Sequence, residues 1–218
     1  MKLPINQPGI LLVDKPKFKT SFSLVAALRR LSGIKTIGHA GTLDPFATGV
    51  MVMLIGKAYT RQSEQLMCQD KEYLATVCLG VETDTYDLEG KIIAENAAIP
   101  SLEDVHNVLL EFQGTISQIP PMFSAKKIKG KKLYDLARKG IEIERAPIQV
   151  NIKTEFISYA YPYLNLKIEC SKGTYIRTIA YDIGKKLKTG AHLSELVRTR
   201  SGSFHLKDCI KGDLLFVN

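Results

Sequence analysis

Apolar positions recur along this sequence with two different periods, and together they predict a mixture of strands and helices. Residues 10–13, 50–55 and 72–80 form short runs rich in apolar residues that end near glycine or proline, and these runs predict strands. The run at 50–55 is apolar at every position. That is typical of a strand buried on both faces, although the period alone does not exclude a helix. Residues 163–170 alternate apolar and polar side chains, which predicts a strand with one buried face.

Four other segments have apolar residues at helical spacing and predict helices: 20–33, 101–114, 131–140 and 174–187. The first can begin at Thr20 or Ser21 and end at Gly33, and its apolar positions are Phe22, Val25, Leu28 and Leu31. The second begins with Ser101 and Asp104 in the spacing of a capping box. No repeat, low-complexity tract or linker interrupts this series, so we expect one mixed α+β domain over residues 1–218.

Charge and cysteine content narrow the class of protein. The chain has 30 Lys and Arg against 22 Asp and Glu, a net charge of +8, which favours a polyanionic partner but is also compatible with a role in solubility alone. Its four cysteines are widely spaced and predict neither a zinc site nor a disulfide framework. There is no signal-peptide pattern, and the longest apolar run is too short to span a bilayer. We therefore expect a cytoplasmic protein without membrane segments.

One loop sequence, GHAGTLDPFATG at residues 38–49, places a single carboxylate, Asp44, among glycines and threonines. Asp44 is the only acidic residue between Asp14 and Glu64. The same interval contains eight cationic residues: Lys15, Lys17, Lys19, Arg29, Arg30, Lys35, Lys57 and Arg61. The loop precedes a buried strand, which is a common position for catalytic groups, although an isolated Asp-Pro more often forms a simple Asx turn.

Several kinds of site are excluded for this loop. It lacks the G-x-x-x-x-G-K-[ST] spacing of a phosphate-binding loop, and no G-x-S-x-G elbow occurs in the chain. His39 is the only other potential metal ligand nearby, and the remaining histidines are scattered, so we expect no metal site and no cofactor. One carboxylate remains, acting as a nucleophile or as a general base. Either role needs an anion, and Arg177 in the segment KGTYIRT is a candidate partner that favours the charged form.

Five ordered blocks of the chain, within residues 10–200, together match the pattern of one known family. These blocks are LLVDKP with Thr20 and Ser21, GHAGTLDPFATGV, DKEYLATVCLGVETDTYDLEG, QIPPMFSAKKIKGKKLYDLARKG, and CSKGTYIRTIAYDIG with GAHLSELVRT. The Asp44 loop and K-G-T-Y-I-R are the most specific. In these blocks the chain resembles the TruB-type tRNA pseudouridine synthases, which isomerise a uridine of the tRNA T-loop. This resemblance implies a pseudouridine-synthase-type α+β catalytic domain, with a mixed, mostly antiparallel sheet flanked by helices and a central active-site cleft.

The resemblance also implies roles for individual residues. Asp44 would attack the nucleoside, Tyr73 would stack on the flipped uracil, and Arg177 would pair with Asp44. Tyr175 would support the pocket, Leu196 would pack against the target base, and His39 would contact T-loop bases. Without the resemblance, Leu196 and His39 would be interpreted as a core residue and a loop hydrogen-bonding residue. The sequence leaves open whether Asp44 attacks C6 of the base, attacks C1′ or promotes a glycal route.

A lysine-rich stretch, KKIKGKK at residues 126–132, predicts contacts to the RNA backbone. Such a run is often only a solvated face, but beside a base-flipping pocket it would bind phosphates. The residues expected to contact the RNA backbone are Lys15, Lys127, Lys129 and Lys131. The expected partner is the T-arm of tRNA, bound by a monomer without a nucleotide cofactor.

The chain departs from the family pattern at Phe18, where glycine is usual, and at Thr60, which follows Gly56 with one extra residue. Many relatives carry a C-terminal RNA-binding PUA domain, and none is expected within these 218 residues. Two other functions stay open. The chain can be an RNA-binding or tRNA-folding protein on the same scaffold, or a pseudouridine synthase with a different RNA target.

Overall fold

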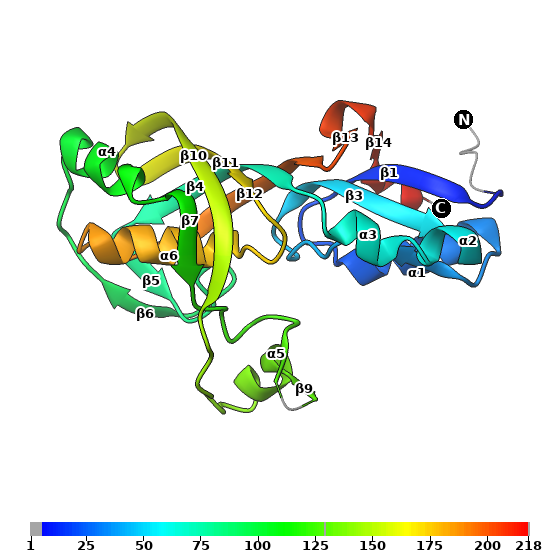
Figure 1. The fold of residues 1–218 in the computed structure, drawn as a ribbon, viewed down its shortest axis with the longest axis horizontal. Coiled ribbons are helices and arrows are strands. Elements are labelled where there is room, and N and C mark those ends of the chain that lie inside the picture. The colour runs from blue at the N-terminus through cyan, green and yellow to red at the C-terminus, as the bar shows by residue number, and fades with distance from the viewer. Residues whose placement is uncertain (1–5, 129, 218) are drawn as a thin grey trace. The chain divides into compact units, whose positions relative to one another are not determined.

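The computed structural model describes residues 6–128 and 130–217, and its ribbon is shown in Figure 1. The chain forms two compact units, one made of Met1–Leu74 with Leu196–Asn218 and the other of Ala75–Glu195. They are called the first and second unit below. The chain passes from one unit to the other inside two strands, β4 (Lys71–Leu79) and β12 (Ala191–Ser201).

The first unit is built around β3 (Thr48–Ile55), whose residues from Gly49 onward are all buried. Its sheet order is β14-β1-β3-β12, and β1 is antiparallel to β3 whereas β12 is parallel to it. Two short strands extend this sheet, because β2 pairs with β3 and β13 with β12. The other elements are β1 (Gly9–Lys15), α1 (Ser21–Ser32), β2 (Ile37–His39), α2 (Lys57–Thr60), α3 (Ser63–Met67), β13 (Phe204–His205), β14 (Ile210–Lys211) and two 3₁₀ turns, Leu206–Asp208 and Gly212–Leu215.

Helix α1 confirms the expected caps, and its buried face includes two of the four residues at helical spacing, Val25 and Leu28. The hydroxyl of Thr20 accepts a hydrogen bond from the backbone N–H of Ser23, and Gly33 ends the helix in the left-handed conformation at φ 73°. The buried apolar side chains are Leu24, Val25, Ala27 and Leu28. Phe22 and Leu31, which also have helical spacing, are 67% and 40% exposed. Their spacing matched a helix, but the face that packs on the sheet is centred elsewhere.

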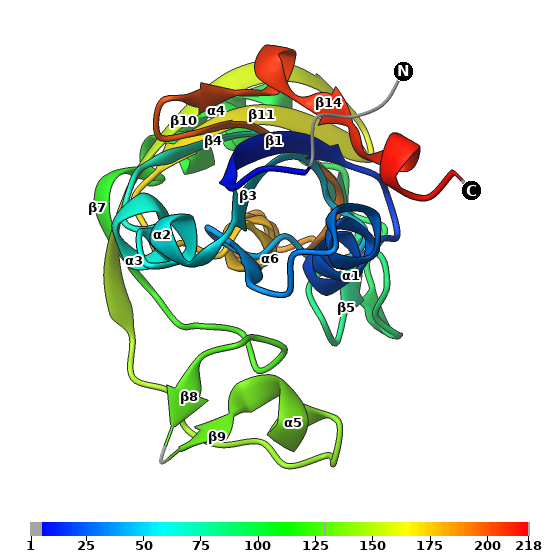
Figure 2. The same cartoon turned by 90° about the vertical axis from the view of Figure 1, so that its right-hand side faces the viewer.

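The second unit contains the sheet order β4-β11-β10-β7, whose β10 pairs are both antiparallel, and helices α4 and α6, which contact each other. Two separate hairpins, β5–β6 and β8–β9, complete it. The bounds are β5 (Val81–Thr83), β6 (Ile92–Glu95), α4 (Leu102–Leu110), β7 (Gln113–Gln118), β8 (Lys127–Ile128), β9 (Lys131–Lys132), α5 (Leu133–Ala137), β10 (Ile148–Ala160), β11 (Tyr163–Cys170) and α6 (Ile176–Lys186). Figure 2 shows β8, β9 and α5 next to one another.

Local sequence signals predicted β1, β3, β4 and β11 and the helices α1, α4, α5 and α6, whereas the long strands β10 and β12 were not predicted. Ser101 and Asp104 form the expected capping box at the start of α4. The alternating segment is strand β11, with its apolar positions buried. The helix expected to reach Gly140 is shorter, because α5 ends at Ala137 and the chain continues in a turn. The strands and helices together give the expected α+β class, with a mixed and mostly antiparallel sheet.

The described part of the chain lacks two further kinds of feature. No helix there is long and apolar enough to cross a membrane. Residues 6–128 and 130–217 also contain no group of three or more His, Cys, Asp or Glu side chains arranged to hold a metal ion.

Candidate active site

Asp44 lies in the connection between β2 and β3, two antiparallel neighbours. The Asp44 side chain is partly exposed, but the flanking Leu43 and Phe46 are buried. At Leu43 the backbone N–H donates to the hydroxyl oxygen of Ser21 at 3.0 Å, and that hydroxyl donates to the Leu43 carbonyl oxygen at 3.1 Å. Apolar anchors and backbone hydrogen bonds therefore hold the loop that presents this carboxylate.

Two buried cations bind the backbone on either side of Asp44 in sequence. The guanidinium of Arg198, 1% exposed, donates to the carbonyl oxygens of Gly41 at 3.2 Å, Thr42 at 3.4 Å and Val50 at 2.8 Å. Lys15 donates through Nζ to the Pro45 carbonyl oxygen at 2.8 Å. Because both side chains end in positive charge, they place cations beside the loop as well as ordering it.

The position of Lys15 corrects the expectation that this residue contacts the RNA backbone. Its side chain is 0% exposed, and Nζ donates to three carbonyl oxygens, of Pro16 at 2.9 Å, Lys19 at 2.5 Å and Pro45 at 2.8 Å. An ammonium has three protons to donate, which matches these three acceptors. The charge of Lys15 therefore serves the fold of the Asp44 loop.

His39 ends β2, and its side chain is partly buried. Burial lowers the pKa of His39, the positive charge of Arg198 lowers it further, and the Gly41 backbone opposes both effects. Among the described residues its Nδ1 atom has no partner at hydrogen-bond distance. His39 therefore favours the neutral imidazole, which has one donor and one acceptor nitrogen.

Tyr73 and Leu196 lie on buried faces of β4 and β12 within the first unit. Leu196 shares its face of β12 with Arg198, because side chains of a strand alternate, and Arg198 reaches the Asp44 loop. Beside Tyr73, the Glu72 carboxylate accepts a 2.7 Å hydrogen bond from the Thr199 hydroxyl. The first unit thus holds four of the expected site residues: Asp44, His39, Tyr73 and Leu196.

Arg177 is in the first turn of α6, and its side chain is buried in the second unit. Its guanidinium lies 3.5 Å from the carboxylate of Asp87 and donates to the carbonyl oxygens of Thr85 at 3.0 Å and Phe123 at 2.8 Å. Asp87 is also buried, and its carboxylate accepts from the Thr85 hydroxyl at 2.6 Å and the Glu89 N–H at 3.0 Å. This buried ion pair fixes the direction of the arginine.

Tyr175 is the N-cap residue of α6, so the helix predicted over residues 174–187 begins directly after it. The buried amide of Gln118 binds its backbone on both sides: Oε1 accepts from the Tyr175 N–H at 2.8 Å, and Nε2 donates to the Tyr175 carbonyl oxygen at 3.0 Å. The end of β7 therefore positions the start of α6.

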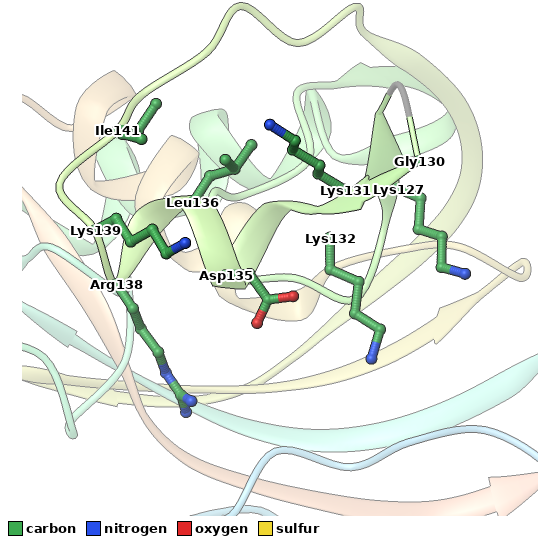
Figure 3. Close-up of a pocket in the computed structure, with 9 residues that line it drawn as sticks. All are labelled: Lys127, Gly130, Lys131, Lys132, Asp135, Leu136, Arg138, Lys139 and Ile141. Atoms are coloured by element: carbon green, nitrogen blue, oxygen red, sulfur yellow. The ribbon is translucent and has the colours of Figure 1, made fainter.

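Lys127 and Lys131 are exposed on the β8–β9 hairpin, and Lys129 lies outside the described residues. The hairpin and α5 line a hollow with five cationic side chains and one acidic one, drawn in Figure 3. Its lining residues are Lys127, Gly130, Lys131, Lys132, Asp135, Leu136, Arg138, Lys139 and Ile141. Such a surface suits an anionic ligand.

Three buried polar residues were not expected to serve the site: Asp87, Gln118 and Arg198. Asp87 and Gln118 lie in motifs that carried the resemblance, T-x-T-x-D and Q-x-P-P, so the signal was present without an assigned role. Arg198 lies two positions after Leu196 in GAHLSELVRT, another of these segments. Its contact with the loop depends on β12 lying beside β3, which no local pattern predicts.

Comparisons with known proteins agree with these motifs. The model of the TruB family pseudouridylate synthase N-terminal domain matches residues 29–176, and that of the tRNA pseudouridylate synthase B C-terminal domain matches residues 177–215. The chain belongs to the TruB family of pseudouridylate synthases. This family makes pseudouridine in tRNA. Three relatives named tRNA pseudouridine synthase B illustrate the match: Protochlamydia amoebophila (62% identity, 96% of this chain and 80% of the relative), Chlamydia abortus (56%, 95% and 88%) and Clostridium tetani (48%, 93% and 70%).

Solved structures show the same fold. A chain of a Cbf5-Nop10-Gar1 complex matches with a TM-score of 0.75 and 28% identity, over 97% of this TruB-family chain and 54% of the solved chain. A chain of an H/ACA RNP bound to a substrate RNA containing 2′-deoxyuridine matches with a TM-score of 0.71 and 26% identity, over 97% and 54%. The chain therefore spans about half the length of these solved chains.

Proposed function

We propose that this TruB-family chain converts one uridine of the tRNA T-loop, at position 55, to pseudouridine, with the carboxylate of Asp44 as the attacking group. The observation that most directly supports this proposal is the support of the Asp44 loop: buried Arg198 and Lys15 donate hydrogen bonds to the backbone before and after Asp44. A group that must meet a sugar or base in one orientation needs such a rigid support.

Different residues are proposed to contact the extruded base and its neighbours. A uridine inside a folded loop is stacked, so an enzyme must extrude it and compensate for the stacking that is lost. Tyr73 supplies an aromatic face on β4, and Leu196 supplies an apolar wall on β12. His39 and Tyr175 are proposed to contact neighbouring bases and to support the pocket.

The reaction is balanced without an added reactant. The N1–C1′ bond of the uridine breaks, the base rotates, a C5–C1′ bond forms, the C5 proton leaves and N1 gains a proton. Asp44 must act as an anion, attacking C6 or C1′ or promoting the glycal route, and Arg177 is proposed to pair with it. The Asp87 contact orients the arginine within its unit. Preorganised charge of this kind stabilises charge that develops in the transition state.

Recognition of the T-arm is proposed to use the cationic β8–β9 hairpin. Lys127 and Lys131 are exposed there, beside the hollow that α5 completes. Phosphate contacts orient an RNA without reading its sequence, so the choice of position 55 would depend on the shape of the loop and on base contacts near the flipped uridine. We further propose that the chain acts as a monomer in the cytoplasm.

Tritium release from C5-labelled uridine in an unmodified tRNA transcript tests the proposal. The C5 proton is lost only when C5 becomes the glycosidic carbon. We expect release by the intact protein, none by Asp44→Asn, and none from a transcript with cytidine at position 55. Glu64→Gln is a matched control that neutralises a carboxylate outside the site and should retain activity.

Each negative result has a separate meaning. Release from the transcript with cytidine at position 55 would show a different target uridine. Release by Asp44→Asn would remove Asp44 from the chemistry. Tight tRNA binding without any release by the intact protein would indicate an RNA-binding or tRNA-folding protein on the same scaffold.

A further inference from the structure

Phe18 has an unusual backbone conformation for an aromatic residue. Its φ is 62°, in the left-handed region that glycine adopts readily and a bulky L-residue does not. Its side chain is 61% exposed, so little burial offsets the strain. Glycine, the usual residue here in the TruB pattern, would avoid both costs. The fold therefore gains little from a phenylalanine at this position.

The strained residue is attached directly to the Asp44 loop. The backbone N–H of Phe18 donates to the carbonyl oxygen of Pro45 at 2.7 Å, and Lys15 donates to that same oxygen at 2.8 Å. Lys15 also binds the carbonyl oxygen of Lys19. The turn at residues 16–19 is thus hydrogen-bonded to Pro45, the residue that follows Asp44. The backbone of this turn cannot relax without breaking these bonds.

The surroundings of the ring are cationic. Lys17 and Lys19 are exposed on either side of Phe18 in the sequence, and the Lys17 ammonium lies 5.6 Å from the centre of the Phe18 ring. The Lys19 ammonium lies 4.7 Å from the ring of Phe216. Exposed aromatic rings among lysines are the chemistry that binds unpaired nucleic acid, because bases stack on the ring while the cations contact phosphates.

We propose that Phe18 is a substrate-binding residue that stacks on an unpaired RNA base near the flipped uridine, with Lys17 and Lys19 contacting the adjoining phosphates. The proposal rests on the proposed function, because the RNA is the substrate of the same site. The ring and the Asp44 loop share the Pro45 contact, so a base on Phe18 lies close to the loop that carries the attacking group.

Fluorescence gives a direct test, because the chain contains no tryptophan. In Phe18→Trp the new indole is the sole tryptophan, and a stacked base should quench its emission when unmodified tRNA transcript is added. Leu31→Trp is the matched control, because Leu31 is also exposed in the first unit, at the other end of α1. Quenching in Phe18→Trp but not in Leu31→Trp supports the proposal. Equal or absent quenching in both overturns it.

A second test separates stacking from charge and from folding. Phe18→Gly should raise the melting temperature, because glycine accepts the positive φ, and should weaken tRNA binding about tenfold, as expected for one lost base stack. The salt slope of binding should stay unchanged in Phe18→Gly and should fall by about one unit in Lys19→Gln. Unchanged affinity in a correctly folded Phe18→Gly would overturn the proposal.

These measurements distinguish a failure of the stacking proposal from a failure of the proposed function. Tritium release by the intact protein reports the reaction, whereas the Phe18 variants report binding. If the intact protein releases tritium and Phe18→Gly binds equally well, only the stacking proposal fails. A protein that releases none but still quenches the tryptophan at position 18 would bind RNA at this surface without catalysing the reaction.

Discussion

Replacing Lys15 by methionine tests whether this residue stabilises the Asp44 loop, as the structure indicates, or contacts the RNA backbone, as the sequence predicted. The sequence predicted a phosphate contact, whereas the structure buries the ammonium against three carbonyl oxygens. Methionine has a similar length and apolar stem, so Lys15→Met removes the charge and the three donors while filling most of the space. We expect a loss of stability with no change in the electrostatics of tRNA binding.

The magnitude follows from the contacts. A hydrogen bond to a charged group contributes about 1.5–3 kcal/mol, and three such bonds are lost together, although the Pro45 carbonyl oxygen keeps its bond from the Phe18 N–H. The wild-type protein also bears the cost of removing the ammonium from water, several kcal/mol, which the variant avoids. The free energy of unfolding should therefore fall by about 3 kcal/mol, and the melting temperature by about 6–12 °C.

Urea denaturation and tRNA binding at several salt concentrations measure the two effects. Lys17→Met is the matched control, because Lys17 is exposed and only two positions away. Lys15→Met should lose stability and keep the salt slope of the wild-type protein. Lys17→Met should keep its stability and show a slope shallower by about one unit.

The opposite pattern would refute this reasoning. If Lys15→Met unfolded at the wild-type urea concentration and bound tRNA with a shallower salt slope, its ammonium would be a phosphate ligand in solution. The Lys15 ammonium would then be exposed, and not buried, in the protein that binds RNA.

Three further changes test other parts of the structure. Asp87→Asn leaves a buried arginine without its carboxylate, so kcat should fall at least tenfold with little change in KM, and thermal melting should show a loss of about 2 kcal/mol. Burial raises the pKa of Asp182 to about 6. Between about pH 4 and 6 the folded state therefore retains a proton on Asp182 that the unfolded state has released. The free energy of unfolding falls as the pH rises through this range. Asp182→Asn should flatten that part of the stability profile and add about 1 kcal/mol at pH 7 after allowance for partial exposure; an unchanged profile would contradict it. Changing Lys127 and Lys131 together to glutamine should raise KM and reduce the salt slope by about two units in binding titrations, and an unchanged slope would exclude the hairpin from RNA binding.

Local patterns in the sequence identified β1, β3, β4 and β11 and the helices α1, α4, α5 and α6, but not the long strands β10 and β12. The fully apolar run became β3, the S-x-x-D spacing became the capped start of α4, and the alternating segment became β11. These signals depend on residues close in the chain, through hydrogen bonds to neighbouring backbone and through side chains that share one face. The family motifs also identified the class of reaction, because they retain the residue types that the chemistry requires.

Side-chain environments were less accessible from the sequence. Phe22 and Leu31 have helical spacing but face solvent, because the packing of α1 on its sheet, and not the spacing alone, selects the buried face. The proposed contact between Arg177 and Asp44 stays a prediction, since it joins residues of different units. What the structure does establish for Arg177 is its pairing with Asp87, ninety positions earlier.

The amino-acid sequence by itself determined several strands and helices, the family and the candidate attacking residue, because each depends on short-range pattern or on residue identity. The tertiary structure decided which charged side chains are buried and which groups they bind. Lys15 and Arg198 are ordinary cations in the sequence, yet both are buried and bind the backbone of the Asp44 loop. Burial and long-range strand pairing produce that difference, and neither is encoded in the neighbours of a residue along the chain.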